Sequence, residues 1–396
     1  MAGLKLLVLA FLILSLGMPC WGESTLSFRG IGLMDEGTDA RSRGMGGAHL
    51  SVGDGQGFSL GNPATVGRLT RTSIAVGFLG EQVRAEMDWG GEGRLLAGNL
   101  SLFRLVLPLA YGTVVSVGLF PYSRVDFDLA ENVEGAIAYH QRIEGIGGLR
   151  LVSIALGRPI GEHLLIGGEF RSFFGAIVET WTRDFEEPAL LDTRDVFTRA
   201  HRGHTWGGGV TIRFTEGLSA SATYVLKTTL NVETMLESVS GGTWSEQEDR
   251  GLPTEMGFGI AWRPMASLLI ALDGTRTFWD GRSGADRDGL QLSIGAEYMR
   301  SRKPEASYLY HIPLRIGIKW RALPYEIGVP RSGINERFLS VGIGFPLRGG
   351  RGIVDVALEI GQRGHLEQHG LRETVVRQAI SFSGWERWFE RRHKSR

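Results

Sequence analysis

The sequence contains a single cysteine, Cys20, and it lies in a leader segment. Lys5 is followed by an apolar run from Leu6 to Leu16, the pattern of a secretory signal peptide, and Gly22 suits cleavage directly after it. We therefore predict that residues 1–22 are removed and that the mature chain offers no disulfide and no thiol chemistry. Lipidation of Cys20 is the alternative, although the residues before it fit a lipidation signal poorly.

Net charge and a second long apolar run are also missing. The 43 Lys and Arg residues balance 43 Asp and Glu residues, so the chain has no basic surplus for nucleic acid. A membrane-spanning helix needs about 20 consecutive apolar residues, and no such run follows the leader. Any membrane crossing must therefore use strands. Glycine, by contrast, is abundant, with 58 of 396 residues, against a usual share of ~7%.

The chain has instead an alternation of apolar and polar residues with a period of two. In residues 312–320 and 339–347, large apolar residues alternate with Ser, Gly, Pro, Arg and Lys. Successive side chains of a strand point to opposite faces, so each segment has one apolar and one polar face. Because the pattern recurs along the chain behind an export signal, it predicts an all-β, antiparallel transmembrane barrel with lipid outside and a polar lumen.

Turn residues divide the chain after about residue 69 into fourteen predicted strands, an even number as bacterial barrels require. These are 70–88, 98–109, 112–128, 142–158, 163–180, 197–214, 218–233, 253–264, 267–279, 289–301, 308–320, 335–347, 351–361 and 371–383. Tight connections alternate with longer polar ones, which are predicted at 186–195, 233–252 and 322–334. Since bacterial barrels have short periplasmic turns and long outer loops, both termini are predicted to be periplasmic.

The alternation also places charged residues of both signs in the lumen, opposite lipid-facing residues such as Ile260, Leu292 and Val356. They are Arg213, Lys227, Arg263, Arg315, Lys319, Arg377, Asp273, Glu297, Asp355, Glu359 and Glu373. Their near balance predicts a network of ion pairs between barrel and plug, whereas an ion-selective pore favours a ring of like charge.

Residues 23–69 lack the strand period and are rich in glycine. They also carry scattered apolar residues, among them Phe28, Met45 and Phe58, which can anchor a folded segment. We therefore expect a plug in the periplasmic mouth of the barrel, where its backbone can be satisfied within the lumen. A disordered leader is the alternative, and the apolar residues argue against it.

Two short segments of this plug resemble a known family. Arg43-Gly44-Met45-Gly46-Gly47-Ala48, followed by Asn62-Pro63-Ala64, is similar to the hatch of the long-chain fatty-acid transporter (FadL-like) outer-membrane family, including its PorV-like relatives. Residues 120–125 and 388–392 also look like motifs of these relatives. The resemblance implies a fourteen-stranded barrel whose hatch acts as a gate, with freedom at Gly44, Gly46 and Gly47 and a rigid turn at Asn62, Pro63 and Ala64. Unlike many barrels, the chain continues past Phe382 into a basic tail.

Pro121 falls in the middle of the third predicted strand. Proline has no N–H for the ladder, so it indicates a local defect in the pairing. In the family that the chain resembles, a kink in this strand forms a lateral opening for hydrophobic molecules. We therefore expect Phe120, Pro121 and Tyr122 to frame such an opening, with Phe28, Met45 and Phe58 helping to line an apolar pocket. A harmless bulge, or a defect at Pro313 instead, is the alternative.

Signals of catalysis and metal binding are weak. Gly57-Phe58-Ser59-Leu60-Gly61 matches G-x-S-x-G, but that motif needs a strand, a sharp turn and a helix. His201 and His204 would lie on opposite faces of a strand, and His365 with His369 fits an outer loop better than a metal site. We expect no enzyme activity, no cofactor and no metal.

The sequence therefore predicts four parts: a signal peptide (1–22), a hatch (23–69), a barrel (70–384) and a periplasmic tail (385–396). The favoured function is passive uptake of hydrophobic small molecules, fatty-acid-like or hydrocarbon, across the outer membrane of a bacterium, with membrane lipid around the barrel. The alternative is a PorV-like scaffold or shuttle for a secreted or periplasmic protein, in which the connection 233–252 with Trp244 is the binding element. No nucleic-acid partner is expected.

Overall fold

The structure, a computed structural model, describes residues 24–54, 57–88, 92–135, 137–187, 189–238, 242–280, 285–303, 305–328, 330–347 and 349–386. The predicted signal peptide lies outside these residues, as does the predicted tail apart from Trp385 and Glu386. The domain boundaries drawn from the sequence therefore stay predictions.

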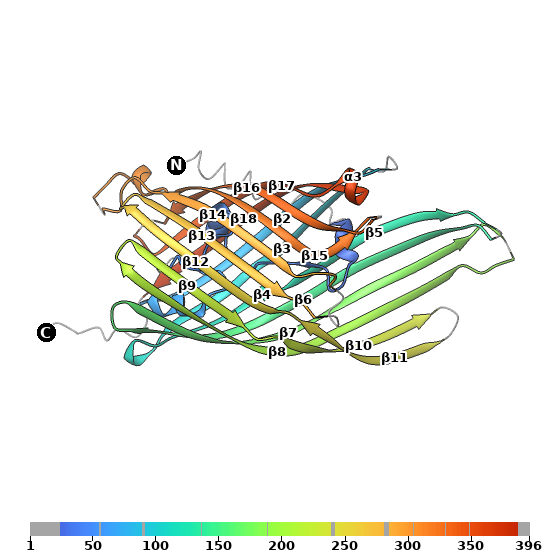
Figure 1. The fold of residues 1–396 in the computed structure, drawn as a ribbon, viewed down its shortest axis with the longest axis horizontal. Helices are drawn as coiled ribbons and strands as arrows, with labels where there is room; N and C mark the ends of the chain where they lie inside the picture. The colour runs from blue at the N-terminus through green and yellow to red at the C-terminus, as the bar shows by residue number, and fades with distance from the viewer. Residues whose placement is uncertain are drawn as a thin grey trace.

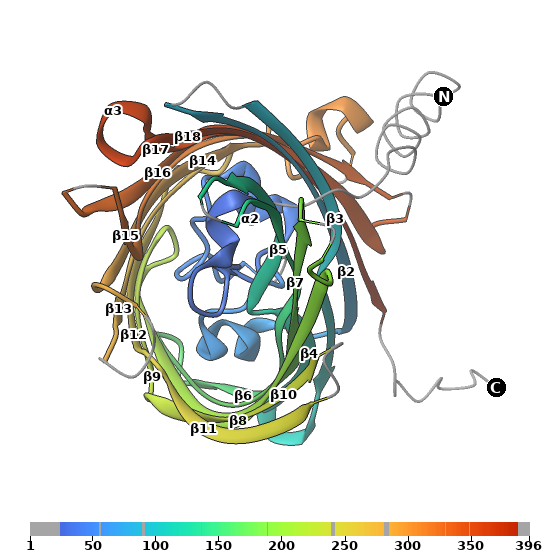
Figure 2. The same cartoon turned by 90° about the vertical axis from the view of Figure 1, so that its right-hand side faces the viewer.

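A closed antiparallel barrel surrounds a folded N-terminal plug, so the predicted fold class, an all-β barrel of 14 strands with an internal N-terminal segment, is confirmed (Figure 1; Figure 2). The wall consists of β2 (Thr72–Met87), β3 (Glu92–Pro108), β4 (Val114–Pro121) with β5 (Ser123–Val133), β6 (Tyr139–Ile160), β7 (Leu164–Phe185), β8 (Thr193–Thr215), β9 (Leu218–Val225) with β10 (Thr228–Ser238), β11 (Thr243–Leu252) with β12 (Thr254–Met265), β13 (Leu268–Phe278), β14 (Gly289–Tyr298), β15 (Leu314–Ile327), β16 (Ser332–Pro346), β17 (Gly352–His365) and β18 (Leu371–Glu386).

The last strand closes the barrel by pairing with the first. β18 pairs with β2 from Leu371↔Met87 to Glu386↔Thr72, a register without interruption. The wall therefore begins and ends at the same end of the barrel, which we call the terminal end. Short connections after β6, β8 and β12 lie at this end too. The longest described connection there, between β14 and β15, carries the short helix η4 (Tyr308–His311).

At the opposite end, the strands β5 to β8 and the β10–β11 hairpin project far beyond the rest of the wall, as Figure 1 shows. We call this the extended end. The prediction of a polar loop over 233–252 was wrong, because β10 and β11 pair there from Thr228↔Leu252 to Glu237↔Thr243. The predicted loops at 186–195 and 322–334 are also shorter than expected. Residues 243–249 of β11 are exposed at every position, so they carry no apolar alternation and their sequence looks like a loop.

The outer face of the wall is an apolar band. Side chains such as Phe78, Ile154, Ile260, Leu292 and Ile318 are exposed on it, while their sequence neighbours are buried inside. In a soluble sandwich these residues would form the core; here they face outward around the whole ring, the arrangement of a barrel in hydrocarbon. Among the residues that the structure describes, no helix is both long and apolar enough to cross a bilayer.

The plug is built from four short elements inside the ring: η1 (Thr25–Phe28), β1 (Leu33–Met34), α2 (Ala40–Gly44) and η2 (Pro63–Arg68) (Figure 2). Each helix begins with a side-chain cap, at Ser24, Asp39 and Asn62 respectively. Such caps satisfy N–H groups that a helix leaves free at its start. The plug can therefore keep polar backbone away from water without being part of the wall.

Candidate functional site: the plug network and the break in the wall

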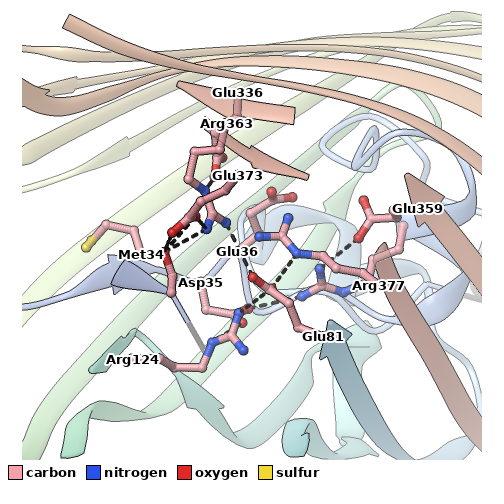
Figure 3. Close-up of polar contacts among 12 residues, drawn as sticks. Met34, Asp35, Glu36, Glu81, Arg124, Glu336, Glu359, Arg363, Glu373 and Arg377 are labelled. Atoms are coloured by element: carbon pink, nitrogen blue, oxygen red, sulfur yellow. Dashed lines mark hydrogen bonds and ion pairs between the residues drawn. The ribbon is translucent and has the colours of Figure 1, made fainter. Parts of the chain in front are cut away.

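A network of buried ion pairs fixes the plug to the wall (Figure 3). At its centre, the Arg363 guanidinium lies 2.5 Å from Glu336, 2.7 Å from Glu373 and 3.4 Å from Glu81. Glu373 also accepts hydrogen bonds from the hydroxyls of Ser24 (2.8 Å) and Thr25 (2.6 Å) at the start of the plug. One wall carboxylate thus serves the barrel and the plug together.

A second branch joins the plug to β5. Glu81 on β2 accepts from Arg377 Nε at 2.7 Å and lies 3.5 Å from Arg124. Arg124 lies 3.4 Å from Asp35 of the plug, and Asp35 is itself 3.2 Å from Arg43 of α2. The start of β5 is therefore tied both to the wall and to the plug (Figure 3).

The plug residue Glu36 faces the opposite wall. Lys319 donates to Glu36 at 2.7 Å and also reaches Glu359 at 3.1 Å. Burial raises the pKa of Glu36, but Lys319 and then Arg321 lower it by more, so its pKa lies well below the ordinary value and the carboxylate stays charged.

A third group lies nearer the terminal end. Arg41 of α2 binds Asp54 through two hydrogen bonds of 2.8 and 2.7 Å and reaches Glu297 on β14 at 2.8 Å. Arg315 then joins Glu297 (2.9 Å) to Asp355 (2.7 Å). Removing one partner of such a buried pair typically costs about 3–5 kcal/mol, because the other charge is left unpaired. The plug is therefore held by many contacts of this kind.

The predicted balance of charge in the lumen is thus observed as an ion-pair network. Of the predicted inward charges, Arg315, Lys319, Arg377 and the five carboxylates are buried, whereas Arg213 and Arg263 are half-buried near the terminal end. Lys227 is different, since it is exposed between β9 and β10. The prediction for Lys227 was wrong because the strand is interrupted there, and a two-residue period does not carry across an interruption.

The third wall strand breaks at Tyr122, between β4 and β5. β4 pairs with β3 from Pro108↔Val114 to Phe103↔Leu119 and with β6 up to Pro121↔Arg150. Beyond the break, β5 keeps β6 as a neighbour but takes β1 of the plug as its other one, through Leu33↔Arg124 and Met34↔Ser123. Figure 2 shows β5 lying inside the ring beside the plug.

Glycines on β6 and β7 make this inward turn feasible. Gly147 and Gly148 have φ of +121° and +130°, and Gly175 on β7 has φ of +154°. A Cβ on Gly148 would lie 2.3 Å from the carbonyl oxygen of Ser123, on the first residue of β5. Such backbone conformations strongly favour glycine. Tyr122 itself keeps a hydrogen bond, from its N–H to the Leu149 carbonyl at 2.8 Å.

The departure of β5 leaves a lateral pocket in the wall, with about 1270 Å³ of open space. Phe120, Pro121 and Ser123 line it from the broken strand. Leu100, Ile146 and Phe174 also line it and are 37, 60 and 41% exposed on the apolar outer band. The pocket therefore opens sideways, at the level where the barrel meets hydrocarbon.

A second cavity, with about 1000 Å³ of space, lies in the lumen between the plug and the wall. Val225, Trp279, Leu290 and Leu323 give it apolar lining, and Arg171, Glu255 and Glu36 add charge. Tyr122 lines it as well and packs edge-on against Phe173, with 4.8 Å between ring centroids. Since both chain neighbours of Tyr122 line the lateral pocket, this aromatic pair lies between the two spaces.

The structure brings together four of the six residues predicted either to frame the opening or to help line an apolar pocket. Phe58, Phe120 and Tyr122 belong to one buried cluster, and Phe28 packs against that cluster through Phe127 at 6.3 Å. Met45 does not join them, because it packs on the other side of the plug with Ala261 and Leu269. Pro313, the competing position, precedes β15, and its carbonyl accepts from Gly344 N at 3.0 Å, so the pairing continues there.

The hatch motif packs closely against the wall. A Cβ on Gly44 would lie 2.9 Å from Gly342, and one on Gly46 would lie 2.6 Å from the Ile318 carbonyl oxygen. Gly46 and Gly47 have φ of +66° and +87°. Close approach thus accounts for these glycines, and their use in a moving gate stays a prediction.

Asn62, Pro63 and Ala64 start η2 as a rigid corner. The Asn62 side chain accepts from Ala64 N at 3.0 Å and donates to the Leu50 carbonyl at 2.7 Å. Pro63 takes the first helical turn, where its missing N–H costs nothing. The backbone of Pro63 and Ala64 touches β7 at Gly167, where a side chain would lie 2.4 Å from Pro63.

Ser59 supports the plug. Its hydroxyl donates to Asp39 at 3.2 Å and shares a 2.8 Å hydrogen bond with Ser42, while Asp39 also caps α2. Within the described ranges, no group of three His, Cys, Asp or Glu side chains converges on a metal position.

Several of these residues were not predicted from the sequence. Arg363 and the two-residue strand β1 were not predicted, although Arg363 lies at an inward position of β17, and Arg124 was noted only as part of the motif 120–125. The pair Gly147-Gly148 was a usable signal, because two adjacent glycines in a strand that otherwise alternates indicate a close approach of another backbone.

The fold is that of the outer-membrane channels of the FadL type. It matches a Pseudomonas aeruginosa FadL homologue (TM-score 0.63, 13% identity, 89% of this chain and 98% of the other). It also matches the CymD monoaromatic hydrocarbon channel (TM-score 0.57, 16% identity, 89% and 98%). A third match is the P. putida toluene transporter TodX (TM-score 0.57, 15% identity, 89% and 99%). At these identities the likeness shows the fold alone.

A match between the sequence and a family model identifies the family. The model of the BamG family matches residues 4–394, so the chain belongs to that family. Comparison with curated proteins finds no match. The sequence resemblance to FadL-like proteins is therefore confirmed for the fold, while the family name is BamG.

Proposed function

We propose that the chain is an outer-membrane channel through which hydrophobic small molecules leave the lumen sideways, between β3 and β5, while the plug stays in place. The position of Tyr122 carries this proposal. Its ring lines the lumen cavity, and its chain neighbours Pro121 and Ser123 line the lateral pocket. A passenger moving from the cavity to the lateral pocket would therefore pass the aromatic pair Tyr122 and Phe173.

Three features support a hydrophobic passenger. The rim of the lateral pocket continues the apolar outer band, so a molecule leaving there enters hydrocarbon, although Arg124, Asp126 and Arg150 also line the pocket. The lumen cavity has an apolar majority with a few polar groups, which suits an amphipathic or aromatic molecule. Two proteins of the same fold are a monoaromatic hydrocarbon channel and a toluene transporter.

We further propose that the terminal end faces the periplasm, as the predicted signal peptide and the short turns suggest. The extended end then faces the outside, where β5 to β8 and the β10–β11 hairpin stand above the membrane. Passage runs down a concentration gradient from outside to the membrane. No chemical step is proposed.

Replacing Pro121 with valine tests the route. Valine restores an N–H and a branched side chain that favour continuous pairing, so the gap should narrow and uptake of toluene or a long-chain fatty acid by cells carrying the chain should fall severalfold. Pro253→Val is the matched control, because Pro253 likewise interrupts a wall strand, between β11 and β12, but lines neither the lateral pocket nor the lumen cavity. Equal uptake by both variants would reject the lateral route.

A scaffold for a secreted or periplasmic protein is the second candidate, and one observation favours it. The outer half of β11, residues 243–249, is exposed at every position, and it carries Trp244, Glu246, Glu248 and Asp249. Such a hairpin has a free face for a partner. A photoreactive residue in place of Trp244 should then give a discrete protein crosslink in cells, whereas the channel alone gives none.

A further inference from the structure

A pocket at the terminal end of the barrel collects arginines from the plug and the wall. It offers about 470 Å³ of open space and is lined by Arg68 at the end of η2, Arg213 near the end of β8 and Arg263 near the end of β12. A fourth guanidinium, that of Arg302, lies near Arg263, but it is also 3.6 Å from the Glu297 carboxylate. Three separate elements thus contribute positive charge to one space.

The carboxylates at this pocket do not balance these arginines. Asp54 is bound by Arg41 through two hydrogen bonds and lies 3.3 Å from Arg263. Glu216, on the turn between β8 and β9, also lines the pocket and is exposed. Among the described residues, no carboxylate lies within ion-pair distance of Arg68 or Arg213; Arg213 is held by a hydrogen bond to the Glu162 carbonyl. The pocket therefore has a surplus of positive charge.

The position of Arg68 is built into the plug. Gly53 leaves room for its stem, because a Cβ on Gly53 would lie 3.2 Å from Arg68 Cδ. Burial lowers the pKa of Arg68, and Arg213 and Arg263 lower it further, while Asp54 opposes them. Placing these guanidiniums together is unfavourable without a counterion, so the arrangement favours an anion between them.

Two aromatic side chains indicate the level of the pocket relative to the membrane. Phe214 follows Arg213 and Trp262 precedes Arg263, and they are 58 and 50% exposed on the outward face of the same strands. Aromatic residues at the rim of a barrel lie at the level of the lipid headgroups. The arginines therefore face the lumen at the same level as the lipid phosphate groups that surround the outer side of the wall.

We propose that this pocket binds a phosphate group, free or carried by a phospholipid headgroup, and that the bound phosphate bridges the plug to the wall. Guanidinium groups bind phosphate oxygens through paired hydrogen bonds, and several of them on different elements can share one tetrahedral anion. The open space exceeds that of a bare phosphate, which leaves room for an ester. This site is independent of the lateral route, since it lies at the terminal end.

Binding is tested on the full chain, purified in a non-ionic detergent. The protein is titrated with sodium phosphate and, separately, with a short-chain phosphatidylglycerol. Sodium chloride at equal ionic strength gives the background. Arg68→Gln and Arg213→Gln should each weaken binding by about tenfold, the loss of one charge-assisted hydrogen-bonding group. Arg194→Gln is the control, because Arg194 is exposed at the opposite end of the same strand, β8. Two single variants on different elements guard against a folding defect in one of them.

Binding of both probes shows a general phosphate site, and binding of the lipid alone shows that the headgroup is the source; either result supports the proposal when both arginine variants weaken it. If neither probe binds above the chloride background, or if Arg194→Gln weakens binding as much as the pocket variants, the proposal is wrong.

Discussion

Three wall strands are interrupted, at Tyr122, at Leu226 with Lys227 and at Pro253, and the first two differ in whether the wall opens. Between β9 and β10 the chain breaks at Leu226 and Lys227, but both halves still pair with β8 on one side and with β12 or β11 on the other. Leu226 N even keeps a hydrogen bond to the Trp206 carbonyl at 2.9 Å. Between β4 and β5 the second half exchanges β3 for the plug strand β1.

The difference lies in what receives the strand after the break. β5 is drawn inward by Arg124, which reaches Asp35 of the plug and Glu81 of the wall, and by the glycines of β6 that let it pass. Near the other break, Arg250 donates to the Gly30 carbonyl at 3.1 Å, but the strand stays in the wall. An interruption alone therefore does not make an opening; an inner partner for the displaced strand is also needed.

Removing the centre of the plug network should have the largest effect. Arg363→Met leaves Glu81, Glu336 and Glu373 buried around an uncharged side chain, and the loss of stability should be about 3–5 kcal/mol. Samples are incubated at a series of temperatures and run on gels without boiling, where folded and unfolded barrels migrate differently. The loss of stability is measured as a lower unfolding temperature. Arg142→Met is the control, since its pair with Asp128 is exposed and worth less than about 1 kcal/mol. Equal losses would mean that the network does not hold the plug.

A smaller effect is expected from the glycines at the two breaks. Gly148→Ala places a Cβ 2.3 Å from the Ser123 carbonyl at a φ of +130°, so β5 must shift, at a cost of about 1–3 kcal/mol. Gly203→Ala, beside the other break, has no positive φ and meets first the flexible end of Leu230. Gly148→Ala should therefore unfold at a lower temperature than Gly203→Ala. The reverse order would contradict the strain assigned to β5.

Acidification should give the smallest effect. The folded-state pKa of Glu36 is lowered, so its charge stabilises the folded protein above the unfolded pKa of about 4.3, and this contribution is lost as pH falls further. The unfolding temperature should drop below about pH 4.5, and the drop should be less steep in Glu36→Gln than in the unchanged chain. Parallel pH profiles would show that Glu36 does not contribute through its charge.

Much of the fold could be predicted from the sequence, because a two-residue period is a property of each strand by itself. The alternation around Ile316 and Val341 gives both the strands and the face that each residue occupies. The predictions failed where this period does not apply: in β11, whose residues 243–249 are all exposed, and at Lys227, which lies in an interruption.

The candidate site was predicted less completely. Pro121 could be found because proline removes a donor wherever it lies in a ladder. The partner of β5 could not be found, since β1 has only two residues, Leu33 and Met34, and its pairing joins segments about ninety residues apart in sequence. The role of Arg363 depends on three carboxylates from three other strands, and only the closed barrel brings them together.

One disulfide tests directly whether the lateral route works with the plug in place. The sequence has its one cysteine at Cys20, so Met34→Cys with Ser123→Cys, at paired positions of β1 and β5, can form a defined bond. Uptake of toluene should be the same in the oxidised and reduced protein, because the gap exists while β5 is held on the plug. Loss of uptake on oxidation, restored by a reductant, would show that the plug must move and would contradict the account.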